Sequence, residues 1–140
     1  MAVNISKLLF DKLIDYSLSK LPFESCGMLT LKDSHIIDFY PVINISPYRH
    51  KFEMNKEEFE KVYRIYKHDS EKSIGLFHSH TEDFAVPSLA DLDNFKSFNF
   101  SFLLIISHLY RDKPEVRLYF IKEKSLVSED IRVKEVIQNY

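Results

Sequence analysis

The sequence predicts an α/β protein in which helices flank a mixed β-sheet. Three observations support this fold class: apolar residues recur at helical spacing in three segments, short strand-like segments lie between them, and 45% of the 140 residues are apolar. A chain of this length can bury a core without disulfide bonds, so residues 1–140 are expected to form one domain. We find no internal repeat and no Pro/Gly/Ser-rich linker that would divide it.

The N-terminal half is expected to hold a helix, a hairpin and a second helix. A helix over about residues 6–20, ended by Pro22, is predicted by apolar residues at helical spacing: Phe10, Leu13, Ile14, Leu18 and Leu21. The segments CGMLTLKD and SHIIDFYPV then predict two strands with Asp33-Ser34 as their turn. After the irregular stretch 44–54, Asn55 and Glu58 predict a reciprocal helix cap, and the helix continues with one apolar face: Phe59, Val62, Tyr63 and Tyr66.

The C-terminal half is expected to alternate strands with one helix. SIGLFHSH, at residues 73–80, predicts a strand, and a helix should begin near Ser88, with apolar residues at Leu89, Leu92 and Phe95. FSFLLIIS predicts a fully buried strand, and VRLYFIK predicts another after the turn at Asp112-Lys113-Pro114. From Ser125 onward the pattern does not distinguish a strand from a helix.

The composition excludes several classes of partner and site. A net charge of -2 gives no excess of positive charge for nucleic acid or anionic membranes, so neither is expected as a partner. Cys26 is the only cysteine, which excludes an intrachain disulfide and a multi-cysteine zinc cluster. The N-terminal stretch lacks the apolar core of a secretory signal, and the longest apolar run, residues 102–106, is far too short to span a bilayer. We therefore expect a cytoplasmic protein.

Two histidines provide the clearest chemical signal. His78 and His80 end the predicted strand 73–80, and residues two apart in a strand point to the same face, so both can reach one metal ion. A catalytic zinc takes three protein ligands, commonly imidazole nitrogens with a carboxylate oxygen, and keeps one position open for water. A third ligand is therefore needed.

Asp91 is the expected third ligand, because the first turn of the predicted helix can face back toward the end of the strand. Glu82 and Asp83, in the loop between strand and helix, could bind the metal instead. Ser88 and Asp91 also match a capping box, in which case they would only start the helix. The residue pattern alone leaves these possibilities open.

The stretch HSHTEDFAVPSLAD resembles the motif of the JAMM, or MPN+, metalloproteases. In that family a glutamate lies upstream of His-Ser/Thr-His, seven residues, Ser, two residues and Asp, and the spacing from His78 to Asp91 fits without a gap. Glu24 in PFESCGML stands at the glutamate position, whereas Thr81 replaces a frequent proline. The resemblance covers roughly residues 8–121 and implies the JAMM/MPN fold, a cytidine-deaminase-like α/β core.

The resemblance also implies a site and an activity. His78, His80 and Asp91 would bind one Zn²⁺, Glu24 would act as the catalytic base, and Ser88 would help to stabilise the oxyanion. Short prokaryotic relatives suggest a peptidase or isopeptidase that hydrolyses an amide at the C-terminal tail of a ubiquitin-like or sulfur-carrier protein. The oligomeric state is left open, a homodimer included.

Three other functions can be weighed against this one. Relatives that have lost the metal residues are non-catalytic scaffold or assembly subunits, but no ligand is missing here. A zinc nucleoside deaminase shares the architecture but needs two cysteine ligands, and a cysteine peptidase would use Cys26, for which a buried packing role is expected instead. The remaining histidines are interpreted as surface or core residues: His35, His50, His68 and His108.

Overall fold

The structure is a computed structural model that describes residues 2–69, 71–97 and 99–135. In these residues the elements are, in order, β1 (Ala2–Ser6), α1 (Lys7–Lys20), β2 (Cys26–Lys32), β3 (His35–Val42), α2 (Lys56–Tyr66), β4 (Ser73–His80), α3 (Leu89–Ser97), β5 (Phe102–Ser107), β6 (Glu115–Lys122) and β7 (Ser125–Lys134). Each predicted helix and strand is present, with ends that differ by no more than two residues from those expected.

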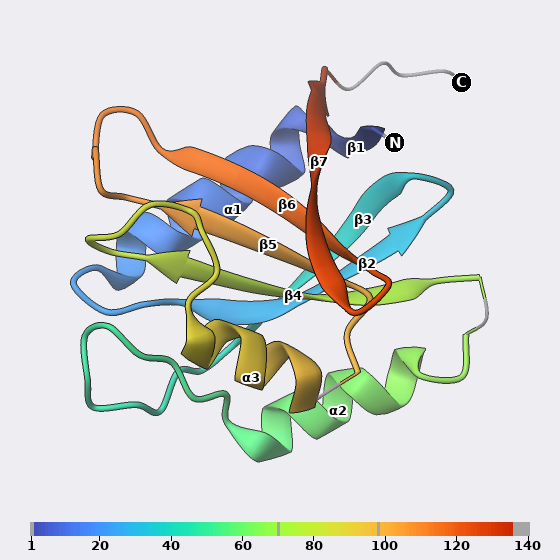
Figure 1. The fold of residues 1–140 in the computed structure, drawn as a ribbon, viewed down its shortest axis with the longest axis horizontal. Helices are drawn as coiled ribbons and strands as arrows, with labels where there is room; N and C mark the ends of the chain where they lie inside the picture. Colours follow the sequence, from blue (N-terminus) through green and yellow to red (C-terminus); the bar gives the residue numbers. More distant parts are fainter. Residues whose placement is uncertain (1, 70, 98, 136–140) are drawn as a thin grey trace.

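The strands form a closed barrel in the order β1-β3-β2-β4-β5-β6-β7, with β1 also paired to β7 (Figure 1). The β1-β3, β1-β7 and β4-β5 pairs are parallel, and the other pairs are antiparallel. The predicted mixed sheet is therefore confirmed, and its closure is an additional finding. No helix in the described parts of the chain is long and apolar enough to cross a membrane.

Two cores lie on opposite faces of the central strands. Because side chains alternate along a strand, Leu76 of β4 packs in one core and its neighbour Phe77 in the other. Leu13 places α1 over the Phe77 core, whereas Phe59 of α2 and Phe95 of α3 pack in the Leu76 core. Figure 1 accordingly shows α1 behind β5 and β6, and α2 and α3 close together at the bottom of the view. Full burial of each such side chain contributes about 1.5–3 kcal/mol.

The cap of α2 differs from the prediction. Asn55 caps the helix as expected, because its side chain accepts a hydrogen bond from the Glu58 N–H at 3.0 Å. The reciprocal bond is absent: the Asn55 N–H donates to the Ile43 carbonyl at 2.9 Å, and the Glu58 carboxylate accepts from the Ile43 N–H at 2.8 Å. Glu58 therefore ties α2 to the segment after β3, and the expectation of a complete capping box was wrong.

Two strands were not predicted. β1 alternates as a half-buried strand, with Val3 and Ile5 inward, and runs directly into α1. The segment from Ser125 is a strand, β7, and residues 136–140 lie outside the described residues. The β6-β7 turn at Glu123-Lys124 has φ values of 50° and 70°, as the predicted Asp33-Ser34 turn has 51° and 62°. Both therefore match the type I′ turns of two-residue hairpins.

Candidate metal centre

The histidine pair lies at the end of a central strand. β4 runs between β2 and β5, so His78 is in register with Cys26 on one side and Ile105 on the other. His78 and His80 share one face of the strand and are 0% and 5% exposed. Phe52, from the loop before α2, stacks on the His78 ring with a centroid distance of 4.7 Å. Packing against Phe52 therefore fixes the His78 imidazole.

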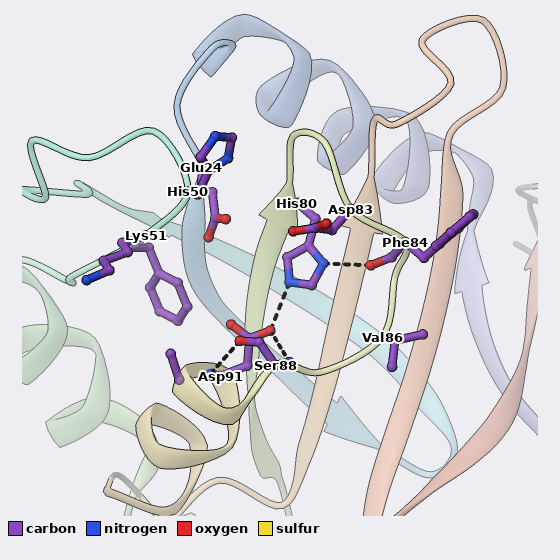
Figure 2. Close-up of a pocket in the computed structure, with 11 residues that line it drawn as sticks. Glu24, His50, Lys51, His80, Asp83, Phe84, Val86, Ser88 and Asp91 are labelled. Atoms are coloured by element: carbon purple, nitrogen blue, oxygen red, sulfur yellow. Dashed lines mark hydrogen bonds and ion pairs between the residues drawn. The ribbon is translucent and has the colours of Figure 1, made fainter.

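Asp91 faces the histidines from the first turn of α3, and Figure 2 shows its carboxylate directed at His80. Its Oδ1 lies 3.0 Å from His78 Nε2, its Oδ2 lies 2.8 Å from His80 Nε2, and the two Nε2 atoms are 3.1 Å apart. The predicted capping box also forms: the Asp91 N–H donates to Ser88 Oγ at 3.0 Å, and the Ser88 N–H donates to Asp91 Oδ2 at 2.9 Å. One carboxylate therefore both starts the helix and faces the imidazoles.

The donor set fits a shared metal ion. The ligand atoms of His78, His80 and Asp91 all lie within 4.8 Å of one another. His80 Nδ1 lies 2.7 Å from the Phe84 carbonyl oxygen, which can only accept, so in neutral His80 the Nε2 lone pair points at the carboxylate 2.8 Å away. Two acceptors this close need a proton or a cation between them. Two imidazole nitrogens and a carboxylate oxygen are a ligand set of catalytic zinc.

The charges of the three groups follow from burial and contact. Burial lowers the pKa of His78 below its usual 6.5, against the opposing effect of Asp91. Burial acts in the same direction on His80, but hydrogen bonds to Asp91 and Phe84 outweigh it and raise the pKa. Burial alone would raise the pKa of Asp91, and the contacts with both histidines instead hold it well below 3.8. Asp91 is therefore a carboxylate and His78 is neutral, whereas His80 holds a proton more readily and has to lose it when a metal binds.

Glu24 reaches the same site from the segment between α1 and β2. It is 6% exposed and lines a cavity of about 460 Å³ together with His80, Ser88 and Asp91 (Figure 2). Burial raises the pKa of Glu24 to about 8, and attraction to His80 opposes this rise. A carboxyl group that exchanges its proton near neutral pH is suited to general acid and base work.

The cavity lies between two loops. Phe84 and Val86, each 58% exposed, come from the loop after β4, and His50 comes from the loop before α2. His50 Nδ1 lies 3.3 Å from Thr81 Oγ1, and its Nε2 lies 3.6 Å from the Glu82 carboxylate. These contacts connect the two loops at Thr81, the position at which the JAMM motif frequently has proline.

The alternative site residues lie apart from the cluster. Glu82 is exposed and faces His50, and Asp83 lines the cavity without joining the three grouped residues. Cys26 is fully buried, its thiol donates to the Val42 carbonyl at 3.3 Å, and burial raises its pKa to about 12. A thiol in this state is not a nucleophile at neutral pH.

The remaining histidines have other surroundings. His35, His50 and His68 are exposed. His108 is buried, its Nε2 lies 2.6 Å from Ser17 Oγ, and its backbone N–H donates to the His80 carbonyl at 2.9 Å. His108 is thus a core residue that docks α1 beside β5.

Three polar residues near Glu24 were missed by the sequence analysis. Ser25 and Ser79 hydrogen-bond each other, and Asn44 hydrogen-bonds the Glu24 carbonyl. Their signal was weak, because an asparagine after a strand and a serine within a strand are common in any protein. Only the position of Ser79 between the two histidines, where the family motif allows Ser or Thr, could have drawn attention to it.

Comparison with known proteins supports the resemblance. The chain is 27% identical over 112 residues to a desampylase from Pyrococcus furiosus, which covers 80% of this chain and 76% of the relative. The solution structure of a Desulfitobacterium hafniense protein matches with a TM-score of 0.76 and 25% identity, over 99% of this chain and 96% of that one. The crystal structure of a JAB1/MPN domain protein from Archaeoglobus fulgidus matches with a TM-score of 0.62 and 17% identity, over 94% of this chain and 100% of that one.

The expected JAMM/MPN fold is therefore confirmed. A family model described as prokaryotic homologs of the JAB domain matches residues 6–122. This range is most of the chain and contains Glu24, both histidines of the pair, Ser88 and Asp91. The chain belongs to the family of prokaryotic homologues of the JAB domain.

Proposed function

We propose that this protein is a zinc-dependent peptidase or isopeptidase that hydrolyses an amide at the C-terminal tail of a ubiquitin-like or sulfur-carrier protein. The observation that carries the proposal is the buried cluster of His78, His80 and Asp91, with Glu24 in the same cavity. Membership of the JAB family and similarity to a desampylase support this class of reaction.

Each residue has a role that its surroundings support. His78, His80 and Asp91 would hold the zinc ion, whose chemistry when bound is to lower the pKa of water and polarise the scissile carbonyl. Glu24 accepts the proton of the attacking water and delivers it to the leaving amine, which suits a buried carboxyl that lines the same cavity as the metal ligands. The Ser88 oxygen accepts from the Asp91 N–H, so its own O–H remains a donor for the developing oxyanion.

The size of the cavity favours an extended tail as substrate. A volume of about 460 Å³ lies within the range of roughly 300–1,000 Å³ found for small-ligand pockets and cannot admit a folded domain. A flexible tail can enter beside Phe84 and Val86 while the folded carrier stays outside. We therefore expect cleavage of extensions on folded carriers and little cleavage at internal sites of unstructured peptides.

The test combines metal analysis with kinetics. The wild-type protein should bind about one zinc per chain and release a short extension from a ubiquitin-like carrier, with loss of turnover on chelation and recovery when zinc is restored. Glu24→Gln keeps the shape of the side chain but cannot take a proton, so turnover should fall by roughly 10²–10⁴-fold at unchanged zinc content. Glu82→Gln, which removes an exposed carboxylate from the adjacent loop, is the matched control and should stay active.

Two outcomes would contradict the proposal. Full turnover in Glu24→Gln would remove Glu24 from the chemistry. A wild-type protein that binds no zinc, even after zinc is added back, would instead fit a non-catalytic assembly subunit.

A further inference from the structure

Glu24 belongs to a stretch that is neither helix nor strand, between the end of α1 and the start of β2. A general base must lie within about 2.6–3.2 Å of the proton that it removes. The backbone that carries Glu24 therefore has to keep a constant position relative to the histidines on β4. Helical or strand hydrogen bonds do not hold this stretch, so other groups must do so.

Ser79 holds the stretch from the side of β4. It lies between the two histidines, is fully buried, and points to the opposite face of the strand. Its Oγ accepts a hydrogen bond from the Ser25 N–H at 2.8 Å and lies 2.9 Å from Ser25 Oγ, and its backbone N–H donates to the Ser25 carbonyl at 3.0 Å. Ser25 directly follows Glu24, so three hydrogen bonds join the metal-binding strand to the residue next to the base.

Asn44 holds the stretch from the other side. Its amide nitrogen donates to the Glu24 carbonyl at 2.9 Å and to the Lys51 carbonyl at 3.2 Å. Its amide oxygen accepts from the N–H groups of Ser46 and Glu53, both at 2.9 Å. The side chain thus connects the backbone of Glu24 to the loop that forms one wall of the cavity.

We propose that Ser79 and Asn44 are positioning residues that keep Glu24 in a constant place relative to the metal-binding strand. The inference rests on the proposed function, because it assigns a purpose to residues that touch neither metal nor substrate. Ser79 is covalently flanked by His78 and His80, so a displacement of β4 carries the histidines and the Glu24 segment together. Asn44 prevents the Glu24 segment from moving away from β4, because its amide nitrogen donates to the Glu24 carbonyl.

The first test separates turnover from binding. Ser79→Ala removes the acceptor of the Ser25 N–H, and we expect kcat to fall by roughly 10–100-fold at unchanged KM and zinc content. Ser79→Thr keeps the hydroxyl and should retain most of the turnover. Asn44→Asp keeps the two acceptor bonds but loses both donors, so it should also lower kcat. Asn44 is only half-buried, so Asn44→Asp should fold even if Ser79→Ala does not. The positioning role can then still be tested with Asn44→Asp alone.

The second test asks whether both residues act through Glu24. In the Glu24→Gln background the base is already lost, so adding Ser79→Ala or Asn44→Asp should change single-turnover rates little, and the effects should be far from additive. A purely structural role would lower the rate by the same factor in both backgrounds. Thr30→Val is the matched control, because it removes a buried hydroxyl that bonds Asp38 on the same sheet without touching Glu24.

The results distinguish this inference from the proposed function. If Glu24→Gln stays active, the proposed function fails whatever Ser79→Ala does. If Glu24→Gln is inactive but Ser79→Ala and Asn44→Asp lower the rate equally in both backgrounds, only the positioning role is overturned. Loss of zinc from Ser79→Ala would also overturn it, since Ser79 would then act on the ligands.

Discussion

The raised pKa of Glu24 predicts how the stability of the metal-free protein depends on pH. Burial raises this pKa from an ordinary 4.5 to about 8, so the folded state binds the Glu24 proton more tightly than the unfolded chain does. The resulting stabilisation is complete below pH 4.5 and is lost as the pH rises through 8. Metal-free wild-type protein should therefore become less stable over this interval, relative to Glu24→Gln.

The size of the effect follows from the two pKa values. At about 1.36 kcal/mol for each pH unit between them, the interval from 4.5 to about 8 gives a ceiling of about 5 kcal/mol. Glu24 lines an open cavity, where water relaxes around the charge and reduces the penalty. We therefore expect the difference between the two proteins to change by about 2–3 kcal/mol, roughly half of the ceiling, between about pH 5 and pH 9.

Urea denaturation of both proteins with a chelator present measures this difference. His78, His80 and Asp91 are present in both proteins, but His80 and Asp91 interact with the charge of Glu24, so the measured difference includes these two couplings. A difference in unfolding free energy that stays constant from about pH 5 to pH 9 would refute the buried, proton-holding state of Glu24.

Two further predictions concern other elements. Asp91→Ala should lower the zinc content and should also remove about 1 kcal/mol of helix-cap stability. If metal analysis finds equal zinc in mutant and parent, Asp91 only caps the helix. Gly75→Ala should destabilise the fold by about 1–3 kcal/mol in urea denaturation, because a Cβ there would lie 2.2 Å from the ring of the buried Phe102. Stability equal to wild type would show that the ring moves aside freely.

Features decided by neighbours in sequence could be predicted. The two-residue spacing of His78 and His80 places them on one face of a strand, and the spacing of Ser88 and Asp91 forms the capping box that aims the carboxylate. Asp33 marked its hairpin turn because aspartate tolerates a positive φ. For these residues the conformation that the local sequence favours is the conformation that the fold adopts.

Features decided by distant partners could not be predicted. Glu123 and Lys124 make the same type of turn as Asp33-Ser34, but neither is a typical turn residue, so the β6-β7 hairpin left no local signal. Glu58 has the spacing of a capping partner, yet it bonds the Ile43 N–H that chain folding brings alongside. The hydroxyl of Ser79 likewise forms its hydrogen bonds only because the fold brings Ser25, 54 residues earlier in the chain, beside it.

The closure of the barrel has a consequence for how the chain acquires its structure during synthesis on the ribosome. β1 pairs with β3 at only Asn4 and Ile5, whereas it pairs with β7 from Ala2 through Ser6, so its main partner is the last strand of the described residues. β1 therefore lacks its longer pairing, the one with β7, until residues near 130 have left the exit tunnel. Such long-range pairing slows folding and prolongs the exposure of apolar surface. The strand that carries Val3 and Ile5 is thus only partly paired while β2 to β6 are made, the interval in which a chaperone would have most to protect.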